Sequence, residues 1–217
     1  MSLFRRIRAL FAAGRGFVTG LSDDAAGQDP LALFDKWLSD AKRAGIFLPE
    51  SMTLATCGSD GSPSARQMLL KGVTEKGFAF YTNYESRKAE ELSANPHAAL
   101  VFHWPILERQ VRVEGLVERV SKEESEAYFQ SRLRGSQIGA WASRQSWKLE
   151  SREEMERKFK EYEQKYPSGD LPLPPFWGGY RLHPLRIEFW QGRLNRLHDR
   201  VCFTRVGGGW EITRLYP

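Results

Sequence analysis

The chain has 217 residues, of which 41% are hydrophobic and 27% are charged, the composition of a soluble globular protein with one sizeable core. Its formal net charge is +5, but four of its 32 basic residues lie without an acid in residues 1–16, which leaves 28 against 27 acidic residues in the rest. A nearly neutral body argues against nucleic-acid binding, which needs basic residues clustered on the fold. No apolar run approaches the ~18 residues of a membrane span.

The first segment is basic and amphipathic. Its apolar side chains recur at helical spacing beside Arg5, Arg6, Arg8 and Arg15, which leaves open a membrane-surface helix, a targeting peptide or a docking arm. The apolar stretch ALFAA is too short for a secretory signal, and chain ends are often poorly ordered. We expect residues 1–28 to form a flexible basic arm and residues 29–217 to form one domain.

The first predicted element of the body is a helix. Asp29 is a suitable N-cap and Pro30 a suitable first helical residue, and Gly45 ends the helix. Its apolar face contains Leu31, Phe34, Trp37, Leu38 and Ala41.

The period then changes to the alternation of β-strands. The next expected elements, separated by a Gly58–Ser62 turn and a short helix at Ser86–Ala94, are the strands Met52–Cys57, Ala65–Lys71, Phe78–Asn83, Ala98–Trp104 and Gln110–Val120.

Two S-x-x-E capping boxes, Ser121 with Glu124 and Ser151 with Glu154, predict two further helices, and SQIGAWAS between them predicts a short one. The last expected strands are Tyr180–Leu182, Arg186–Trp190, Arg200–Arg205 and Trp210–Leu215. Because strands begin and end the body, the order predicts a mainly β fold with peripheral helices (α+β), a closed or split β-barrel rather than alternating βαβ units.

The sequence lacks a nucleotide-binding glycine motif, a nucleophile elbow and a clustered His/Cys metal set. Cys57 and Cys202 match no metal or redox spacing, so we expect small core residues in a cytoplasmic protein without disulfides.

Cations at a helix start are the first candidate site. If Ser86 is the N-cap, Arg87 and Lys88 lie in the first turn, where the helix dipole favours anions. A bound phosphate would pair with both side chains and accept the free N–H groups. The alternative is a solvated helix start with an i,i+3 or i,i+4 ion pair, such as Lys88–Glu91.

Three further patterns suit an anionic ligand. In RLHDR, a strand would place Arg196, His198 and Arg200 on one face. On a helix, Tyr128 and Arg132 are neighbours, and Ser136 follows just past its end. In RQMLLK, Arg66 and Lys71 have opposite parity on a strand, so they cannot share a regular face.

These segments together resemble the pyridoxine/pyridoxamine 5'-phosphate oxidase family. The resemblance extends from about residue 29 to residue 217 and depends on RQMLLKG, FYTNYESRKAEEL, YFQSRLRGSQIGAWASRQS, PPFWGGYRL and IEFWQGRLNRLHDR. It implies an FMN-binding split barrel that acts as a homodimer, with each flavin held between two subunits.

The resemblance also implies the site residues. FMN contacts would come from Arg66, Gln67, Met68, Leu69, Leu70, Lys71, Tyr81, Thr82, Arg87, Lys88, Gln110, Gln145, Ser146, Trp190 and Arg200. Substrate contacts would come from Lys71, Tyr128, Arg132, Ser136, Arg196, Leu197 and His198, with Arg196 and His198 as the catalytic pair facing the pyridine ring. The sequence departs from the family pattern near Arg15, where a substrate-covering segment is expected, and at Leu133, where proline is common.

The implied reaction oxidises pyridoxamine or pyridoxine 5'-phosphate to pyridoxal 5'-phosphate by hydride transfer from C4' to flavin N5. Dioxygen is reduced to hydrogen peroxide, and the amine substrate also releases ammonia. The cofactor supplies the redox chemistry and the protein supplies position and charge. Alternatives are a phenazine-pathway-like oxidase on the same fold and a non-catalytic flavin or pyridoxal phosphate carrier. Nucleic acid and membranes are not expected as partners.

Overall fold

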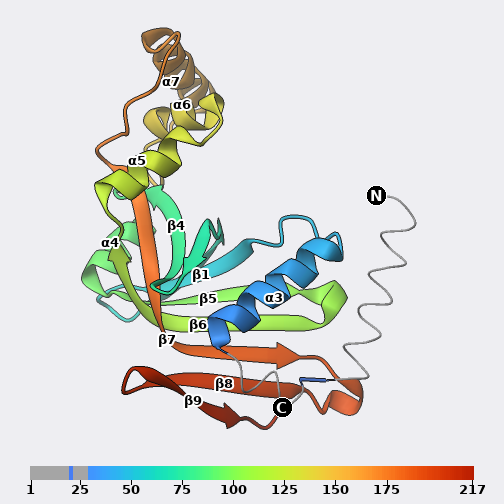
Figure 1. The fold of residues 1–217 in the computed structure, drawn as a ribbon. Coiled ribbons are helices and arrows are strands. Elements are labelled where there is room, and N and C mark those ends of the chain that lie inside the picture. The colour runs from blue at the N-terminus through green and yellow to red at the C-terminus, as the bar shows by residue number, and fades with distance from the viewer. Residues whose placement is uncertain (1–19, 22–28) are drawn as a thin grey trace.

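The protein is described by a computed structural model, which covers residues 20–21 and 29–217 (Figure 1). The predicted arm, apart from Gly20 and Leu21, lies outside the described residues. Leu21 is buried, and its backbone N–H donates to Asp199 at 3.1 Å. No helix in the described ranges is both long and apolar enough to cross a membrane.

One nine-stranded antiparallel sheet forms the body, in the order β2-β1-β5-β6-β7-β4-β3, with β8 beside β7 and β9 beside β8. The strands are β1 (Ser51–Cys57), β2 (Pro63–Leu69), β3 (Gly72–Thr74), β4 (Gly77–Asn83), β5 (His97–Trp104), β6 (Arg109–Arg119), β7 (Trp177–Gln191), β8 (Asp199–Val206) and β9 (Gly209–Arg214).

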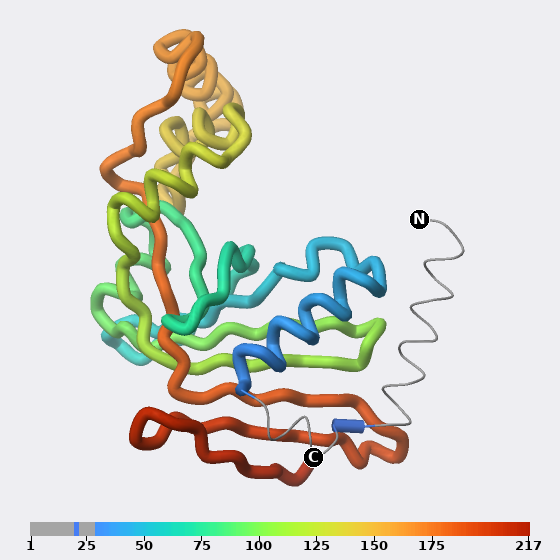
Figure 2. The backbone as a smooth tube through the Cα atoms, viewed as in Figure 1, coloured from blue at the N-terminus to red at the C-terminus, as the bar shows by residue number. Residues whose placement is uncertain are grey.

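Strand β7 divides the sheet. Along one edge it pairs with β6, and along the other its first part pairs with β4 and its second part with β8. The tube in Figure 2 shows the sheet curling where β7 leaves β4 and continues beside β8. This is the expected mainly β, split-barrel fold with peripheral helices.

Helix α3 (Pro30–Arg43) covers one face of the sheet. Its N-cap is Asp29, whose carboxylate accepts the Ala32 N–H at 3.0 Å, as predicted. Phe34 packs edge-on against Phe78 and Phe102, with ring centroids 5.0 and 4.8 Å apart. The main core therefore lies between α3 and the sheet.

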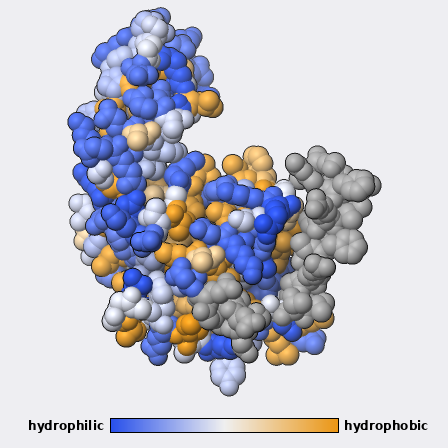
Figure 3. All heavy atoms as spheres, viewed as in Figure 1, coloured by the Kyte–Doolittle hydropathy of each residue, from blue (hydrophilic) through white to orange (hydrophobic). Residues whose placement is uncertain are grey.

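A helical lobe stands beyond the end of the sheet where β7 begins (Figure 1). It contains α5 (Lys122–Gln130), α6 (Arg134–Ala142) and α7 (Arg152–Lys165), while the shorter α4 (Arg87–Ala94) lies against β1. A second small core centred on Phe129, Ile138, Leu171 and Trp177 holds the lobe together. Figure 3 shows that the outer surface of the lobe is largely hydrophilic, and α7 has no buried residue.

The two capping boxes form as predicted, since Ser121 accepts from the Glu124 N–H and Ser151 from the Glu154 N–H. Two strand predictions were wrong. The segments Tyr180–Leu182 and Arg186–Trp190 belong to one continuous strand, β7, and β3 was missed.

Strand β7 continues through Pro184 because a bulge opposite Gly115 accommodates the proline. A Cβ at position 115 would lie 2.0 Å from the His183 carbonyl oxygen, so only glycine fits this close approach.

Candidate functional site

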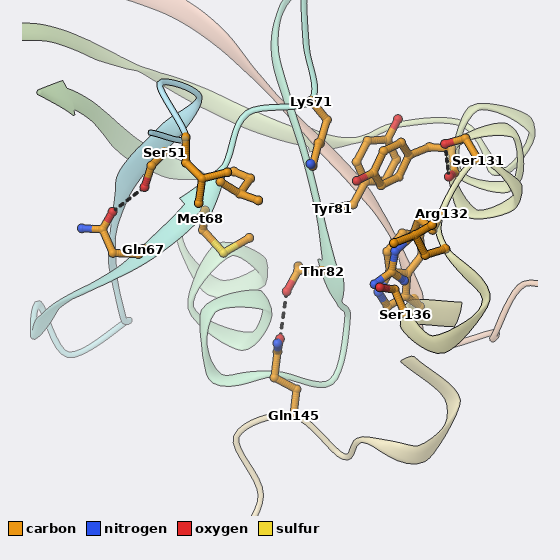
Figure 4. Close-up of a pocket in the computed structure, with 15 residues that line it drawn as sticks. Ser51, Gln67, Met68, Lys71, Tyr81, Thr82, Ser131, Arg132, Ser136 and Gln145 are labelled. Atoms are coloured by element: carbon orange, nitrogen blue, oxygen red, sulfur yellow. Dashed lines mark hydrogen bonds between the residues drawn. The ribbon is translucent and has the colours of Figure 1, made fainter. Parts of the chain in front are cut away.

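A cavity of about 810 Å³ lies between the helical lobe and the end of β2. Figure 4 shows side chains from β2, β4, the lobe and the loop after α6 turned toward this common space. The lining residues are Leu48, Ser51, Gln67, Met68, Leu69, Lys71, Tyr81, Thr82, Tyr128, Ser131, Arg132, Leu133, Ser136, Gln145 and Trp177.

Stacked aromatic rings form one wall of the cavity. Tyr81 stacks on Tyr128 at 3.9 Å between centroids, and both stack on Trp177 at 5.7 and 6.1 Å. A Cβ at Gly179 would lie 2.7 Å from the Tyr81 ring, so glycine at this position lets Tyr81 lie close to β7. Burial, followed by the Glu124 charge, raises the pKa of Tyr81 to about 12. The wall is therefore neutral.

Arg132 lies against this wall, and no carboxylate within residues 20–21 and 29–217 forms an ion pair with it. Its guanidinium is 4.7 Å from the Trp177 ring centroid, and its Nη1 is buried without a hydrogen-bond acceptor. Burial lowers the pKa of Arg132, but a guanidinium keeps its charge in proteins. A buried, charged donor that lacks an acceptor is costly, so this position is suited to an anion. Lys71 faces the same space, with Nζ 5.8 Å from the Tyr128 ring centroid.

Lys88 is a second cation without a carboxylate partner. Its side chain is buried, with 6% of the residue exposed, and Nζ donates to Thr82, Ser86 and Gln145 at 3.2, 3.1 and 2.8 Å. All three acceptors are neutral, and among the described residues no carboxylate lies within ion-pair distance of Nζ. Burial and then the nearby Arg66 charge lower the pKa of Lys88 to about 8.

The start of α4 has free capacity for an anion. Ser86 is its N-cap, as predicted, but the Ser86 hydroxyl donates to the Asn83 carbonyl and does not cap the helix. Part of the alternative holds, because an i,i+4 ion pair forms at this helix start between Arg87 and Glu91 at 2.8 Å. The example given, Lys88–Glu91, does not form, and Lys88 is buried rather than solvated.

The predicted FMN and substrate contacts fall into two groups in the structure, and the first group lies at or beside the cavity. Gln67, Met68, Leu69, Lys71, Tyr81, Thr82, Tyr128, Arg132, Ser136 and Gln145 line the cavity, while Arg66, Leu70, Arg87, Lys88 and Ser146 lie in the adjoining segments and do not line it.

Some backbone assignments in this group were wrong. Strand β2 ends at Leu69, so Lys71 follows the strand, and its backbone N–H donates to Ala79. Arg132 lies in the turn after α5, and Ser136 lies within α6.

The second group of predicted contacts lies on the face of the sheet opposite α3. Its members are Gln110, Trp190, Arg196, Leu197, His198 and Arg200. Gln110, Trp190 and Arg200 form a cross-strand row on β6, β7 and β8, because Gln110 pairs with Trp190 and Trp190 with Arg200. Arg200 donates to Glu188 at 2.8 Å and to the Tyr216 carbonyl at 2.9 Å. The buried Glu188 thus holds Arg200, with Arg112 and Arg186 at 3.6 and 3.8 Å.

The strand predicted through RLHDR was partly wrong. Leu194–Arg196 is a short 3-10 turn, in which Asn195 and Arg196 have φ of 57° and 61°, and β8 begins only at Asp199. His198 nevertheless packs on Trp190 with centroids 4.7 Å apart, and its Nδ1 accepts the Arg193 N–H at 3.1 Å. Leu197 is 68% exposed.

The second group does not line the cavity. Trp177, at the cavity, is the first residue of β7, and Trp190 is near its end; β7 has 15 residues, so roughly 40 Å of strand separates them. One copy of the chain therefore presents the predicted residues as two separate groups.

Sequence reasoning missed three residues that shape these groups. Trp177, in the WGGYR segment, supplies the wall beneath Arg132, and a large aromatic before two glycines was the available signal. Glu91 and Glu188 hold the arginines of the first and second group. The spacing of Arg87 and Glu91 on one helix could have indicated the first contact, but nothing local to Glu188 indicates the second.

Two family models match most of the chain. The sequence matches the family model for pyridoxamine 5'-phosphate oxidase over residues 38–166. It matches the model for the pyridoxine 5'-phosphate oxidase C-terminal dimerisation region over residues 177–217. The second match contains β7, β8 and β9, and hence Trp190, Arg196, His198 and Arg200.

Curated relatives cover almost the whole chain. A pyridoxine/pyridoxamine 5'-phosphate oxidase from Rubrobacter xylanophilus is 58% identical over 91% of each chain. One from Colwellia psychrerythraea is 50% identical over 100% of each chain.

Two solved structures share the fold. PhzG from Burkholderia lata, in complex with tetrahydrophenazine-1-carboxylic acid, has a TM-score of 0.84 and 31% identity, covering 87% of this chain and 93% of its own. An FMN-binding protein related to pyridoxamine 5'-phosphate oxidase, from Nostoc punctiforme, has a TM-score of 0.70 at 17% identity, covering 88% and 99%. The second likeness shows the fold alone.

Proposed function

The chain belongs to the pyridoxine/pyridoxamine 5'-phosphate oxidase family, and from that premise we propose that it binds FMN and oxidises pyridoxamine or pyridoxine 5'-phosphate to pyridoxal 5'-phosphate. It is an oxidoreductase with a flavin cofactor, as its relatives of 50–58% identity and both family models indicate. Its co-substrate is dioxygen, and its products include hydrogen peroxide and, from the amine, ammonia.

The start of α4 fits the phosphate of FMN. Lys88 is a buried cation whose three acceptors are neutral, and Arg87 beside it has its Nε on Glu91, which leaves its terminal nitrogens available. A phosphate at this helix start would compensate the Lys88 charge and accept the free backbone N–H groups. Thr82 and Gln145 would lie close to the phosphate, because both accept hydrogen bonds from Lys88.

The observation that carries the substrate assignment is the buried, unpartnered Nη1 of Arg132. A phosphate monoester placed there would accept from Arg132, Lys71, Tyr128 and Ser136, which all line the cavity. One anion site in the cavity and a second beside it, at the start of α4, suit a phosphorylated substrate next to a phosphorylated cofactor. Holding both phosphates fixes the separation between the reacting atoms, so orientation carries much of the rate.

The second group completes the site from a partner copy. Because it does not line the cavity of its own chain and lies within the matched dimerisation region, we propose a homodimer with two shared sites. Gln110, Trp190 and Arg200 of one copy would contact the flavin held by the other.

The chemistry that FMN would supply when bound is a two-electron oxidation at substrate C4', with dioxygen as the final electron acceptor. The protein's own contribution is position and charge. The Arg196 guanidinium stabilises negative charge on the substrate ring, and His198, held by the Arg193 N–H and by Trp190, faces the phenolic oxygen. Leu197 adds an apolar contact. The stacked wall of Tyr81, Tyr128 and Trp177 excludes water from the other side.

A phenazine-type oxidase is the nearest alternative, because PhzG shares the fold at 31% identity. The B6 assignment is favoured because the curated relatives at 50–58% identity are named pyridoxine/pyridoxamine 5'-phosphate oxidase, whereas PhzG is less similar. Both cysteines are free, which suits the cytoplasmic location we propose.

Absorbance of the purified chain and two oxidase assays test the proposal. We expect a yellow protein with about one FMN per chain that releases peroxide with pyridoxamine or pyridoxine 5'-phosphate. A colourless protein that takes up no added FMN would refute the cofactor assignment. A yellow protein that is inert with both substrates would instead be a carrier or an oxidase of another substrate.

A further inference from the structure

We infer that Glu91 is a positioning residue for the FMN phosphate. The two oxygens of its carboxylate hold Arg66 and Arg87, one each, in the places from which they would contact the phosphate. This inference rests on the proposed function, since it assigns a role within the same phosphate site. Glu91 was not among the residues indicated by the sequence or by the family resemblance.

Four donors converge on the Glu91 carboxylate from three elements. One oxygen accepts from Thr56 on β1 at 2.5 Å, from Ser64 on β2 at 2.6 Å and from Arg66 on β2 at 3.0 Å. The other oxygen accepts from Arg87 on α4 at 2.8 Å. The residue is 8% exposed. Glu91 is thus the point at which the start of α4 is fixed to the two strands.

These contacts keep the carboxylate charged. Burial by itself would raise the pKa of Glu91, but the hydrogen bonds from Ser64, Thr56, Arg66 and Arg87 outweigh it and lower the pKa to about 2. An anion in this position faces three cations, Arg66, Arg87 and Lys88, which would otherwise repel one another at the helix start. The two arginines are therefore ordered before any ligand binds, which reduces the entropy cost of binding phosphate.

Holding Arg66 and Arg87 at once needs both oxygens of the Glu91 carboxylate at their present distance from the backbone of α4. Glutamine offers one acceptor oxygen and an NH₂ group that can only donate, and an arginine cannot accept. Glu91→Gln can therefore hold Arg66 or Arg87, not both. Aspartate keeps both oxygens and the charge, but its shorter side chain withdraws them by one methylene. Both changes should disorder an arginine, although only the first removes charge.

If Glu91 acted only through its charge, the expected change in FMN affinity would have the opposite sign in Glu91→Gln. If Glu91 acts merely as a nearby anion, Glu91→Gln makes the site more positive and should tighten the binding of a phosphate dianion. If Glu91 merely stabilises the fold, any loss should be shared by a flavin that has no phosphate. Riboflavin is that flavin, and it makes the test specific for the phosphate end.

The experiment measures Kd for FMN and for riboflavin on the flavin-stripped full chain, by quenching of flavin fluorescence. We expect Glu91→Gln and Glu91→Asp each to weaken FMN by about tenfold or more, the loss typical of a hydrogen bond to a charged group, while riboflavin Kd is unchanged. Glu90→Gln is the matched control, because it removes the same charge from an exposed neighbour on α4, and it should leave both constants unchanged.

Equal weakening of FMN and riboflavin, unchanged binding, or tighter FMN binding in Glu91→Gln would each overturn the inference. If Glu91→Gln fails to fold, Glu91→Asp decides alone. A wild-type chain that binds FMN no more tightly than riboflavin would instead refute the proposed phosphate site, and the inference with it. Wild-type preference for FMN that survives both substitutions would refute only the role of Glu91.

Discussion

The two groups of predicted site residues differ in how their cations are compensated. At the cavity, Lys88 donates only to neutral groups and Arg132 keeps a buried nitrogen without an acceptor. On the opposite face of the sheet, Arg200 donates to the buried Glu188 and to the Tyr216 carbonyl. The first group thus contains two buried cations, Lys88 and Arg132, that no carboxylate of the described residues pairs, whereas Arg200 of the second group is paired within its own chain.

This difference indicates what each group can do. Unpaired buried cations are costly unless a ligand compensates them, so the cavity group is suited to hold the two phosphates. The paired group is held rigid by its own chain, and its exposed members, such as Leu197, suit contact with a ligand bound elsewhere. Substitutions in the cavity group should therefore weaken ligand binding. Substitutions in the group on the sheet face should instead lower the reaction rate or weaken dimer assembly.

The largest effect should follow charge reversal at Lys88. In Lys88→Glu an anion would lie at the proposed position of the flavin phosphate, and breaking a buried charge interaction costs about 3–5 kcal/mol. FMN should therefore bind roughly 150- to 5000-fold more weakly. Flavin content after purification and a fluorescence titration measure this. Lys122→Glu, an exposed lysine in the first turn of α5, should keep its flavin; loss in both variants would point to general destabilisation.

A smaller, binding-specific effect is expected at Arg132. Its removal takes away a charged hydrogen bond of about 1.5–3 kcal/mol to the substrate phosphate, which is distant from the bond that reacts. KM for pyridoxamine 5'-phosphate should rise roughly 10- to 150-fold with FMN content unchanged, if KM follows the dissociation constant. Arg152→Ala on the exposed start of α7 is the control. A fall in kcat without a change in KM would contradict the assignment.

The smallest expected effect is a pH dependence of FMN affinity. Lys88 has a pKa of about 8 in the free site, and a phosphate dianion binds the protonated form, so binding takes up a proton above that pH. Affinity should be constant from pH 7 to 8 and then fall by up to about tenfold per unit.

None of the described groups that face Lys88 adds to this profile. Thr82, Ser86 and Gln145 do not titrate in this range, Arg66 stays charged, and Glu91, with a pKa of about 2, stays ionised. Titrations between pH 7 and 9.5 with FMN, and with riboflavin as a control that should not vary, measure the effect. A flat FMN profile would show that the Lys88 charge does not contribute.

Elements set by local signals could be predicted from the sequence. Helix α3 begins and ends where its N-cap and the following glycine indicate, and both capping boxes form. The convergence of Tyr128, Arg132 and Ser136 on one cavity also held, although Arg132 lies beyond the helix, because three residues close in sequence stay close across a tight turn.

Features that depend on long-range contacts could not be predicted. The left-handed backbone at Asn195 and Arg196 breaks the expected strand without a glycine to mark it. Pro184 suggested an interruption of β7, yet the bulge at Gly115, distant in sequence, absorbs it. Pairing of Glu188 with Arg200 requires the register of β7 and β8, which no local pattern specifies.

The central claim is that the site combines the cavity group of one copy with the sheet-face group of the other, and mixed dimers test it most directly. Lys88→Glu should lack flavin, and Arg196→Ala should keep flavin but lose most of its kcat. After the two inactive chains are mixed and allowed to exchange subunits, each mixed dimer has one site with both substitutions and one with neither. About half of the dimers would be mixed, so activity should return to about a quarter of the wild-type value. If both groups served a site within one chain, every site would contain one substitution, and the mixture would stay as inactive as its components.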